Sequence, residues 1–139
     1  MKNITGIRKK IWIGVFIIFI LSLGRGLYWY YHFDGINTHV IISTQYSSIP
    51  SKVEVYIDNE LYYKNDSLQI LYEFTNGKYL SFGSHHLKVI VDGTEKYAGY
   101  FIVFPVRWIY IEIQKYRKDY KKDPNWFFVN FTFSPVGLM

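Results

Sequence analysis

Four histidines are the side chains in this 139-residue sequence best suited to binding a metal ion or moving a proton near neutral pH. They are His32, His39, His85 and His86. A zinc site needs converging ligands, as at i and i+2 on one strand face or i and i+4 on a helix. His85 and His86 are adjacent in an expected strand, so their side chains point to opposite faces. We therefore predict surface or turn-capping histidines and no metal site.

Hydrolytic chemistry would need two carboxylates, or a serine, histidine and aspartate, brought together across strands. Glu54, Glu73 and Glu112 occupy the outward phase of alternating segments, which predicts solvent-facing side chains. The sequence contains no cysteine, so it offers no thiol nucleophile, thiolate zinc site or disulfide. Gly24 and Gly26 lie in an apolar segment and not after a strand, unlike a phosphate-binding loop. We predict a protein that is not an enzyme and has no cofactor; an enzyme of unnamed class is the weakest hypothesis.

Aromatic and basic side chains offer a different chemistry, which is contact with a partner. Aromatic residues make up 21% of the chain, and strand alternation cannot turn all of them toward one core. Residues 115–123 carry five cations and two acids, which is typical of a solvated loop but also suits anionic lipid headgroups or an acidic cell-wall polymer. The possible binding surface comprises Trp108, Tyr110, Tyr116, Arg117, Lys118, Tyr120, Lys121 and Lys122.

The formal net charge of +5 is confined to the start of the chain. Residues 1–31 contain five Lys or Arg and no acid, whereas eleven Lys or Arg balance eleven Asp or Glu from residue 32 onward. A neutral body has no large positive field to attract a phosphate backbone. The charge distribution therefore argues against nucleic acid as a partner.

The amino-terminal segment has the pattern of a membrane anchor. Three cations precede an uncharged, mostly apolar run from residue 11 to 23. Thirteen helical residues cover about 20 Å, and extension to residue 31 gives about 31 Å, enough for a hydrocarbon core of about 30 Å. The extension is rich in Tyr and Trp, which collect at membrane–water interfaces. The predicted anchor residues are Arg8, Lys9, Lys10, Trp12, Arg25, Tyr28, Trp29 and Tyr30.

A cleaved signal peptide is the alternative for this segment. Ser22 and Gly24 place small residues where a signal peptidase reads, so cleavage near Gly24 would release a secreted protein. Arg25 opposes this alternative, because a positive charge just after the cleavage site hinders export. In an anchor, its side chain could snorkel to the interface. We favour a single-pass anchor that contacts membrane lipid through residues 11–31, with residues 1–10 in the cytoplasm and the body outside.

The sequence after Phe33 predicts strands and no helix. Apolar and polar residues alternate with period two in short segments separated by turn signals, such as Asp58-Asn59 and residues 65–67. The alternation places apolar residues on one face in the segments 53–57, 68–74, 87–91 and 109–113. We expect an all-β fold, an antiparallel β-sandwich of the immunoglobulin or transthyretin kind, behind one transmembrane helix. The expected strands are 39–44, 52–58, 61–63, 68–74, 79–82, 87–91, 97–104, 109–113 and 126–133. The expected divisions are a basic segment 1–10, an anchor 11–31, a linker 32–38, a β-sandwich domain 39–134 and a tail 135–139.

Four short segments resemble the PEGA family of small β-sandwich domains. They are residues 53–59, residues 83–89, Gly99-Tyr100 and residues 108–113, within a region from about 51 to 114. The family pattern is an alternating strand ending in Asp-Gly, a Gly-x-His-x-hydrophobic strand, a Gly-Tyr and a last alternating strand; here Asn59 stands where the family has the turn glycine. The resemblance implies a domain of exported or surface proteins that binds or spaces and does not catalyse.

These observations support two functional hypotheses. The first is a membrane-anchored, non-catalytic module that has a structural or protein-interaction role in the cell envelope, with an envelope protein as partner. The second is a module that binds a glycan or cell-wall polymer through exposed aromatic rings and the basic loop.

Overall fold

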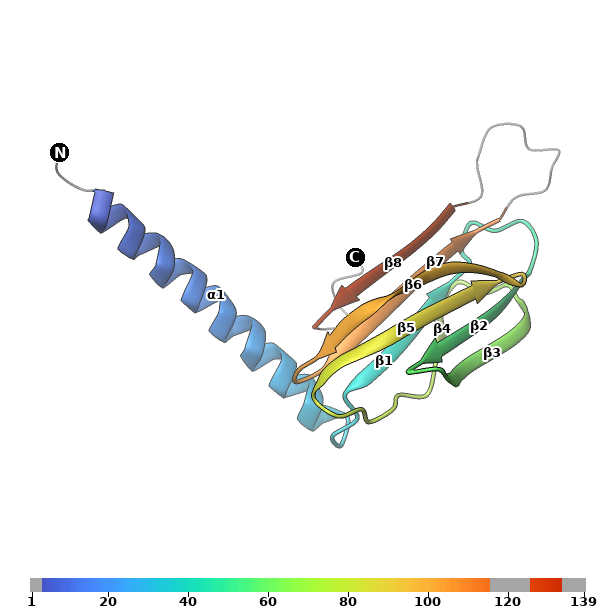
Figure 1. Cartoon of the computed structure of the whole chain (residues 1–139), viewed down its shortest axis with the longest axis horizontal. Coiled ribbons are helices and arrows are strands. Elements are labelled where there is room, and N and C mark those ends of the chain that lie inside the picture. Colours follow the sequence, from blue (N-terminus) through green and yellow to red (C-terminus); the bar gives the residue numbers. More distant parts are fainter. Residues whose placement is uncertain (1–3, 116–125, 134–139) are drawn as a thin grey trace.

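The structure, a computed structural model, describes residues 4–115 and 126–133. One long helix, α1 (Ile4–His32), leads into a β-domain in which two sheets pack face to face (Figure 1). The strands are β1 (Thr38–Ser43), β2 (Ser51–Ile57), β3 (Glu60–Leu68), β4 (Glu73–Phe74), β5 (Gly83–Val91), β6 (Thr94–Val103), β7 (Arg107–Gln114) and β8 (Trp126–Thr132). The mostly β architecture behind one apolar helix confirms the coarse prediction.

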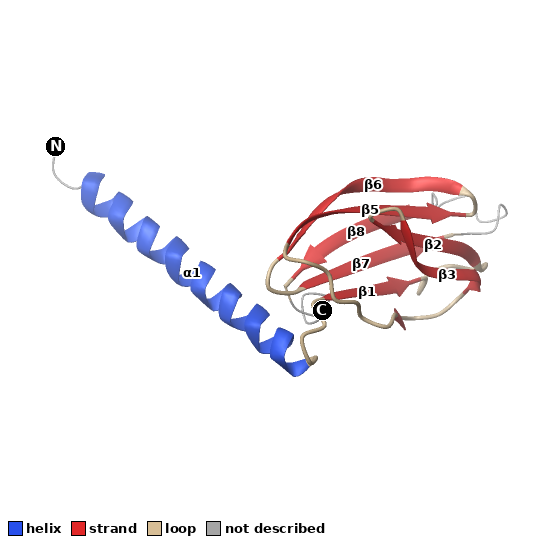
Figure 2. Cartoon of the chain, turned by 60° about the horizontal axis from the view of Figure 1, so that its bottom comes forward, coloured by secondary structure: helices blue, strands red, loops and turns tan. Residues whose placement is uncertain are grey.

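Each sheet contains four of these strands. The first sheet has the order β4-β1-β7-β8, and the second has the order β3-β2-β5-β6. The helix lies at one end of the domain, and the strands run away from its carboxyl end (Figure 2). The β-domain is therefore carried beside the last turns of α1.

The core between the sheets is built from the alternating residues that the sequence identified. Their side chains are buried because strand neighbours point to opposite faces, and one face of each sheet turns inward. Three of the predicted alternating sets are buried: Val53, Val55 and Ile57 from β2; Leu87, Val89 and Val91 from β5; Ile109, Ile111 and Ile113 from β7. The fourth set is not, because Leu68 is buried but Ile70, Tyr72 and Phe74 are exposed. The Asp58-Asn59 turn is also confirmed, since both residues have positive φ and join β2 to β3.

The prediction of a purely antiparallel fold is wrong for one pair of strands. β1 and β7 pair in parallel, from Thr38 opposite Arg107 to Ser43 opposite Glu112. Parallel neighbours need a long crossover, and here the chain builds the whole second sheet between β1 and β7. Alternation reveals which face a residue occupies but not the direction of the neighbouring strand, so the sequence could not show this pairing.

The chain between β3 and β5 also differs from expectation. β3 continues through the predicted turn at 65–67, and of the expected strand 68–74 only β4 is formed. Residues 79–82 form no named strand either. This part of the chain crosses from one sheet to the other, and Thr44 holds it: the Thr44 amide donates to the Ile70 carbonyl at 3.0 Å, while the Thr44 hydroxyl accepts from the Ile70 amide at 2.8 Å.

Asn37 fixes the end of this crossing in the same way. Its side-chain amide donates to the Leu80 carbonyl at 2.7 Å, and its amide oxygen accepts from the Leu80 backbone at 2.8 Å. Asn37 is 0% exposed and its backbone carbonyl accepts from the Arg107 amide at 2.7 Å. The predicted linker 32–38 is thus a packed connection, because its last residues belong to the hydrogen-bonding of the fold.

Replacement of Asn37 tests this role. We expect Asn37→Ala to lower the free energy of unfolding of the β-domain by about 2–3 kcal/mol, since it leaves a buried amide and carbonyl of Leu80 without partners. The half-buried Asn65, whose side chain accepts a local bond from the Ser67 amide, provides the matched control Asn65→Ala. Denaturant unfolding should separate the two variants; equal effects would contradict the assignment.

Candidate functional site: the helix–domain junction

Helix α1 is long and apolar enough to cross a membrane over Gly6–His32. All eight predicted anchor residues lie in it, and most of its large apolar side chains are exposed. Exposure of this kind is typical of a helix that contacts lipid rather than a protein core. The exception is the carboxyl-terminal part of α1, where one face contacts the β-domain.

One close contact is between Gly26 of α1 and Pro105, in the turn between β6 and β7. A Cβ atom built on Gly26 would lie 2.9 Å from Cγ and 3.0 Å from Cδ of Pro105. These distances are too short for a Cβ atom. Because glycine has no side chain, the helix backbone at Gly26 can lie against the proline ring. Gly26 is buried while its neighbours Arg25 and Leu27 are exposed, which marks the contacting face of the helix.

One to two turns beyond Gly26, aromatic rings cover the outer face of the first sheet. We call Trp29, Phe33, His39 and Trp108 the junction cluster. Phe33 lies 5.6 Å from Trp29 and 5.6 Å from Trp108, and the imidazole of His39 stacks on Trp108 at 4.1 Å. Ring pairs at these separations add about 0.5–1.5 kcal/mol each to the apolar area that they bury. The helix is therefore packed onto the domain and not merely tethered to it.

This packing corrects the prediction for Trp108. Its side chain points away from the main core, as strand alternation with Ile109 requires, but it is only 5% exposed because α1 covers it. It is therefore not an open binding surface. Its indole nitrogen has no hydrogen-bond partner among the described residues. A groove of about 420 Å³ runs beside the cluster toward Phe74 and Gly77.

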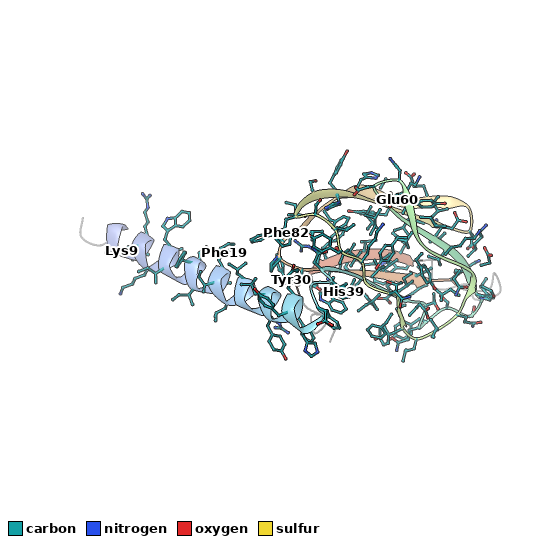
Figure 3. The ribbon with its side chains drawn as sticks, turned by 90° about the horizontal axis from the view of Figure 1, so that it is seen from below. Lys9, Phe19, Tyr30, His39, Glu60 and Phe82 are labelled. Atoms are coloured by element: carbon teal, nitrogen blue, oxygen red, sulfur yellow. The ribbon has the colours of Figure 1, made fainter. Side chains whose placement is uncertain are left out.

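A second ring contact lies on the other side of the helix end. Tyr30 lies 6.2 Å from Phe82, which in turn lies 5.4 Å from Phe104 (Figure 3). The helix stops just beyond, where the Gly35 amide donates to the Tyr30 carbonyl at 3.0 Å and Gly35 has a φ of 81°. Because the chain turns here and enters β1 within a few residues, the junction has little freedom to bend.

The remaining residues of the predicted binding surface are only partly accounted for. Tyr110 lies on β7, is half-buried, and its hydroxyl donates to Glu112 at 3.4 Å. The other six, Tyr116, Arg117, Lys118, Tyr120, Lys121 and Lys122, lie outside the described residues, so the glycan hypothesis that depends on them stays a prediction. A ring pair that the sequence did not single out, Trp126 and Phe128, is exposed and stacked with centroids 5.6 Å apart.

Of the titratable groups, His85 has the most defined environment. Its Nδ1 lies 2.6 Å from the Asp58 carboxylate, and its Nε2 lies 2.8 Å from the Ser81 carbonyl oxygen. A neutral imidazole has one N–H, so both acceptors are satisfied only by the imidazolium. Burial alone would lower the pKa of His85, but the bonds to Asp58 and Ser81 outweigh it and raise the pKa above the usual value. His86 points to the opposite face, as predicted.

The pair joins the β2–β3 turn to the start of β5. Asp58 belongs to the β2–β3 turn, and its second oxygen accepts from the His86 amide at 2.9 Å. Burial would raise the pKa of Asp58, but the bond from His85 and the bond from the His86 amide lower it overall. Within residues 4–115 and 126–133, no three His, Asp or Glu side chains are placed to hold a metal ion. Glu54, Glu73 and Glu112 lie on three different strands.

Comparisons of the chain with protein-family models, with curated proteins and with solved structures find no match. The junction must therefore be interpreted from its own geometry.

Gly26 provides a test of the helix packing. We expect Gly26→Ala to lower the free energy of unfolding of the β-domain in detergent micelles by about 1–3 kcal/mol, because the new methyl group overlaps the Pro105 ring. The control is Gly24→Ala, whose Cβ would meet nothing within 4 Å and which should be neutral or stabilising by up to about 1 kcal/mol. Tryptophan fluorescence during denaturation measures both. Equal stability of the two variants would refute the close packing.

The His85–Asp58 pair predicts a pH dependence. Because the folded pKa of His85 is raised, its stabilisation is complete below the unfolded value of about 6.5 and is lost as the pH rises through the folded value. The lowered pKa of Asp58 gives stabilisation above about pH 3.9 that is lost in acid. We expect the denaturation midpoint to fall as the pH rises above about 6.5, and this fall to be smaller in His85→Gln.

Two features keep this measurement specific. Burial lowers the pKa of His39, partly offset by its bond to the Ile36 carbonyl, so its destabilising effect appears below about pH 6.5 and outside the window. His86→Gln changes the neighbouring, more exposed histidine and should retain the wild-type fall. If His85→Gln and His86→Gln behave alike, the ion pair does not contribute.

Proposed function

We propose that this protein is a membrane-anchored, non-catalytic module that presents its β-domain to a protein partner in the cell envelope. The observation that carries the proposal is the junction, where an apolar helix of spanning length packs directly against the domain through Gly26 and the junction cluster. A domain that needed only to be retained at a membrane would work with a loose linker. A packed junction holds one face of the domain in a constant direction relative to the membrane.

The proposed orientation places the amino terminus in the cytoplasm and the β-domain outside. Arg8, Lys9 and Lys10 precede the apolar run, and cations at this position are retained on the cytoplasmic side. The absence of cysteine fits a domain that is stabilised by packing alone in any redox compartment. A PEGA-like role in binding or spacing is consistent with this arrangement.

The surface offered to the partner is the outer face of β7 and β8. Tyr110, Trp126 and Phe128 lie there beyond the part that α1 covers, since the alternate residues Ile111, Phe127 and Val129 pack into the core. Trp126 and Phe128 are exposed and Tyr110 is half-exposed, and aromatic side chains of this kind often dominate the binding energy of protein interfaces. The acidic and basic residues of β2 and β3, by contrast, form surface ion pairs such as Lys52 with Glu54 at 3.3 Å.

Site-specific crosslinking in intact membranes tests the proposal. We expect a photoreactive amino acid at Phe128 to give one discrete adduct with a second polypeptide, because this ring is exposed on the proposed contact face. The matched control is the same group at Glu60, in the β2–β3 hairpin on the other sheet. Recovery of only free monomer at both positions, or of the same adduct at both, would count against the proposed face.

A further inference from the structure

A cluster of exposed apolar side chains lies at the end of the β-domain that is next to α1. We call the exposed Phe82, Ile102, Phe104 and Phe133, together with Pro105, which is buried against α1, the rim. Phe82, Ile102, Phe104 and Phe133 are 51%, 59%, 48% and 41% exposed, although Phe82 and Phe104 contact each other. Phe82 lies at the helix end of the domain, whereas Glu60 lies farther from the helix (Figure 3). Contiguous exposed apolar surface on a folded domain marks a contact site.

The rim and the helix together enclose an apolar groove of about 330 Å³. One wall is α1 between Val15 and Leu23, and the other is Phe104, Pro105 and Phe133. Ser22 is the sole polar side chain among these lining residues. Because α1 forms one wall of the groove, molecules that surround this part of the helix can also contact the rim.

The length of the helix places the rim at a definite depth. Twenty helical residues cross a hydrocarbon core of about 30 Å, so a span that begins at Ile11, directly after Lys10, ends near Tyr30. Pro105 packs on Gly26, four residues earlier, which is about 6 Å inside that boundary along the helix axis. Tilt of the helix shortens its rise along the membrane normal, so it increases this depth. The part of the domain beside Gly26 therefore meets lipid, and the residues there are apolar.

The charges near the rim agree with this environment. Residues 97–111 and 126–133 contain no Asp or Glu, while Arg107 supplies positive charge beside the rim. Arg107 donates from Nε to the Ile102 carbonyl at 2.7 Å, and its guanidinium lies 4.3 Å from the centre of the Phe133 ring. Among the described residues, no carboxylate forms an ion pair with Arg107 or with Arg25. Arginine that is unpaired beside aromatic rings suits lipid phosphate at the edge of the hydrocarbon core.

From these observations we propose that the rim is a second membrane contact: it sits in the outer leaflet, with a lipid acyl chain in the groove beside α1 and lipid phosphate at Arg107. This inference rests on the proposed membrane anchoring and adds that the domain itself binds the bilayer. A second copy of the chain on the rim is the competing occupant. Lipid is favoured because the groove is continuous with the lipid-facing side of the helix and lies at hydrocarbon depth.

The absence of cysteine allows a direct test with single introduced labels. The environment-sensitive fluorophore NBD is attached to Ile102→Cys and, separately, to Phe104→Cys in the full-length chain, in nanodiscs of phosphatidylcholine and phosphatidylglycerol. We expect blue-shifted emission, loss of fluorescence with nitroxide-labelled acyl chains, and protection from aqueous iodide. Glu60→Cys is the control in water and should show the opposite pattern. Two rim positions are labelled so that, if one variant folds poorly, the other still tests the rim contact.

A third label separates this inference from the anchoring on which it rests. Phe19→Cys lies in the middle of α1 and should be quenched by lipid whenever the helix spans the bilayer. Quenching at Phe19→Cys with iodide-accessible rim labels would overturn the rim contact and leave the anchor intact. Iodide access at all positions would overturn both. Protection of the rim from iodide without quenching by lipid would indicate a second copy or another protein, and would also refute the proposal.

Discussion

The packing of the end of α1 on the first sheet is the constraint on which the rest of the structure depends. Two contacts join the apolar helix to the β-domain. Gly26 packs against Pro105, and the rings of Trp29 and Phe33 pack against Trp108. The contact sets which surfaces remain free: it covers the outer face of β7 near Trp108 and leaves the rim beside the helix. Both proposed roles, presentation of an aromatic face and contact with lipid, follow from that one arrangement.

Polar residues, in contrast, organise the connections and not the core. Asn37 binds both backbone groups of Leu80, Thr44 does the same for Ile70, and His85 joins the β2–β3 turn to the Ser81 carbonyl. These segments have no complete strand partner, so side chains supply the hydrogen bonds that a ladder would supply. The sheets specify the shape of the domain, and a few buried polar side chains specify how the chain passes between them.

Much of the β-domain was predictable because strand alternation is a local signal. The inward sets of β2, β5 and β7 were identified correctly, and the positive φ of Asp58 and Asn59 agrees with the expected turn. The expected strand 68–74 was wrong because its alternating Ile70 and Tyr72 belong to a crossing between sheets and stay exposed. The junction could not be predicted, since it joins residues 26–33 to residues 104–108 and no local pattern connects them. Gly26 within an apolar helix was the one available hint.

The parallel pairing of β1 with β7 has a mechanical consequence. β1 follows directly from the helix and lies in the interior of the first sheet, between β4 and β7, with six residues paired to β7. A force that pulls α1 away from the far part of the domain would act on β1 at Thr38. It would be directed along β1 and β7, parallel to the strands. The bonds of such a ladder are loaded in shear and must yield together, whereas a terminal hairpin can be unzipped one bond at a time. The strand that bears the tension is thus held to β7 by a ladder of six residue pairs that must separate together.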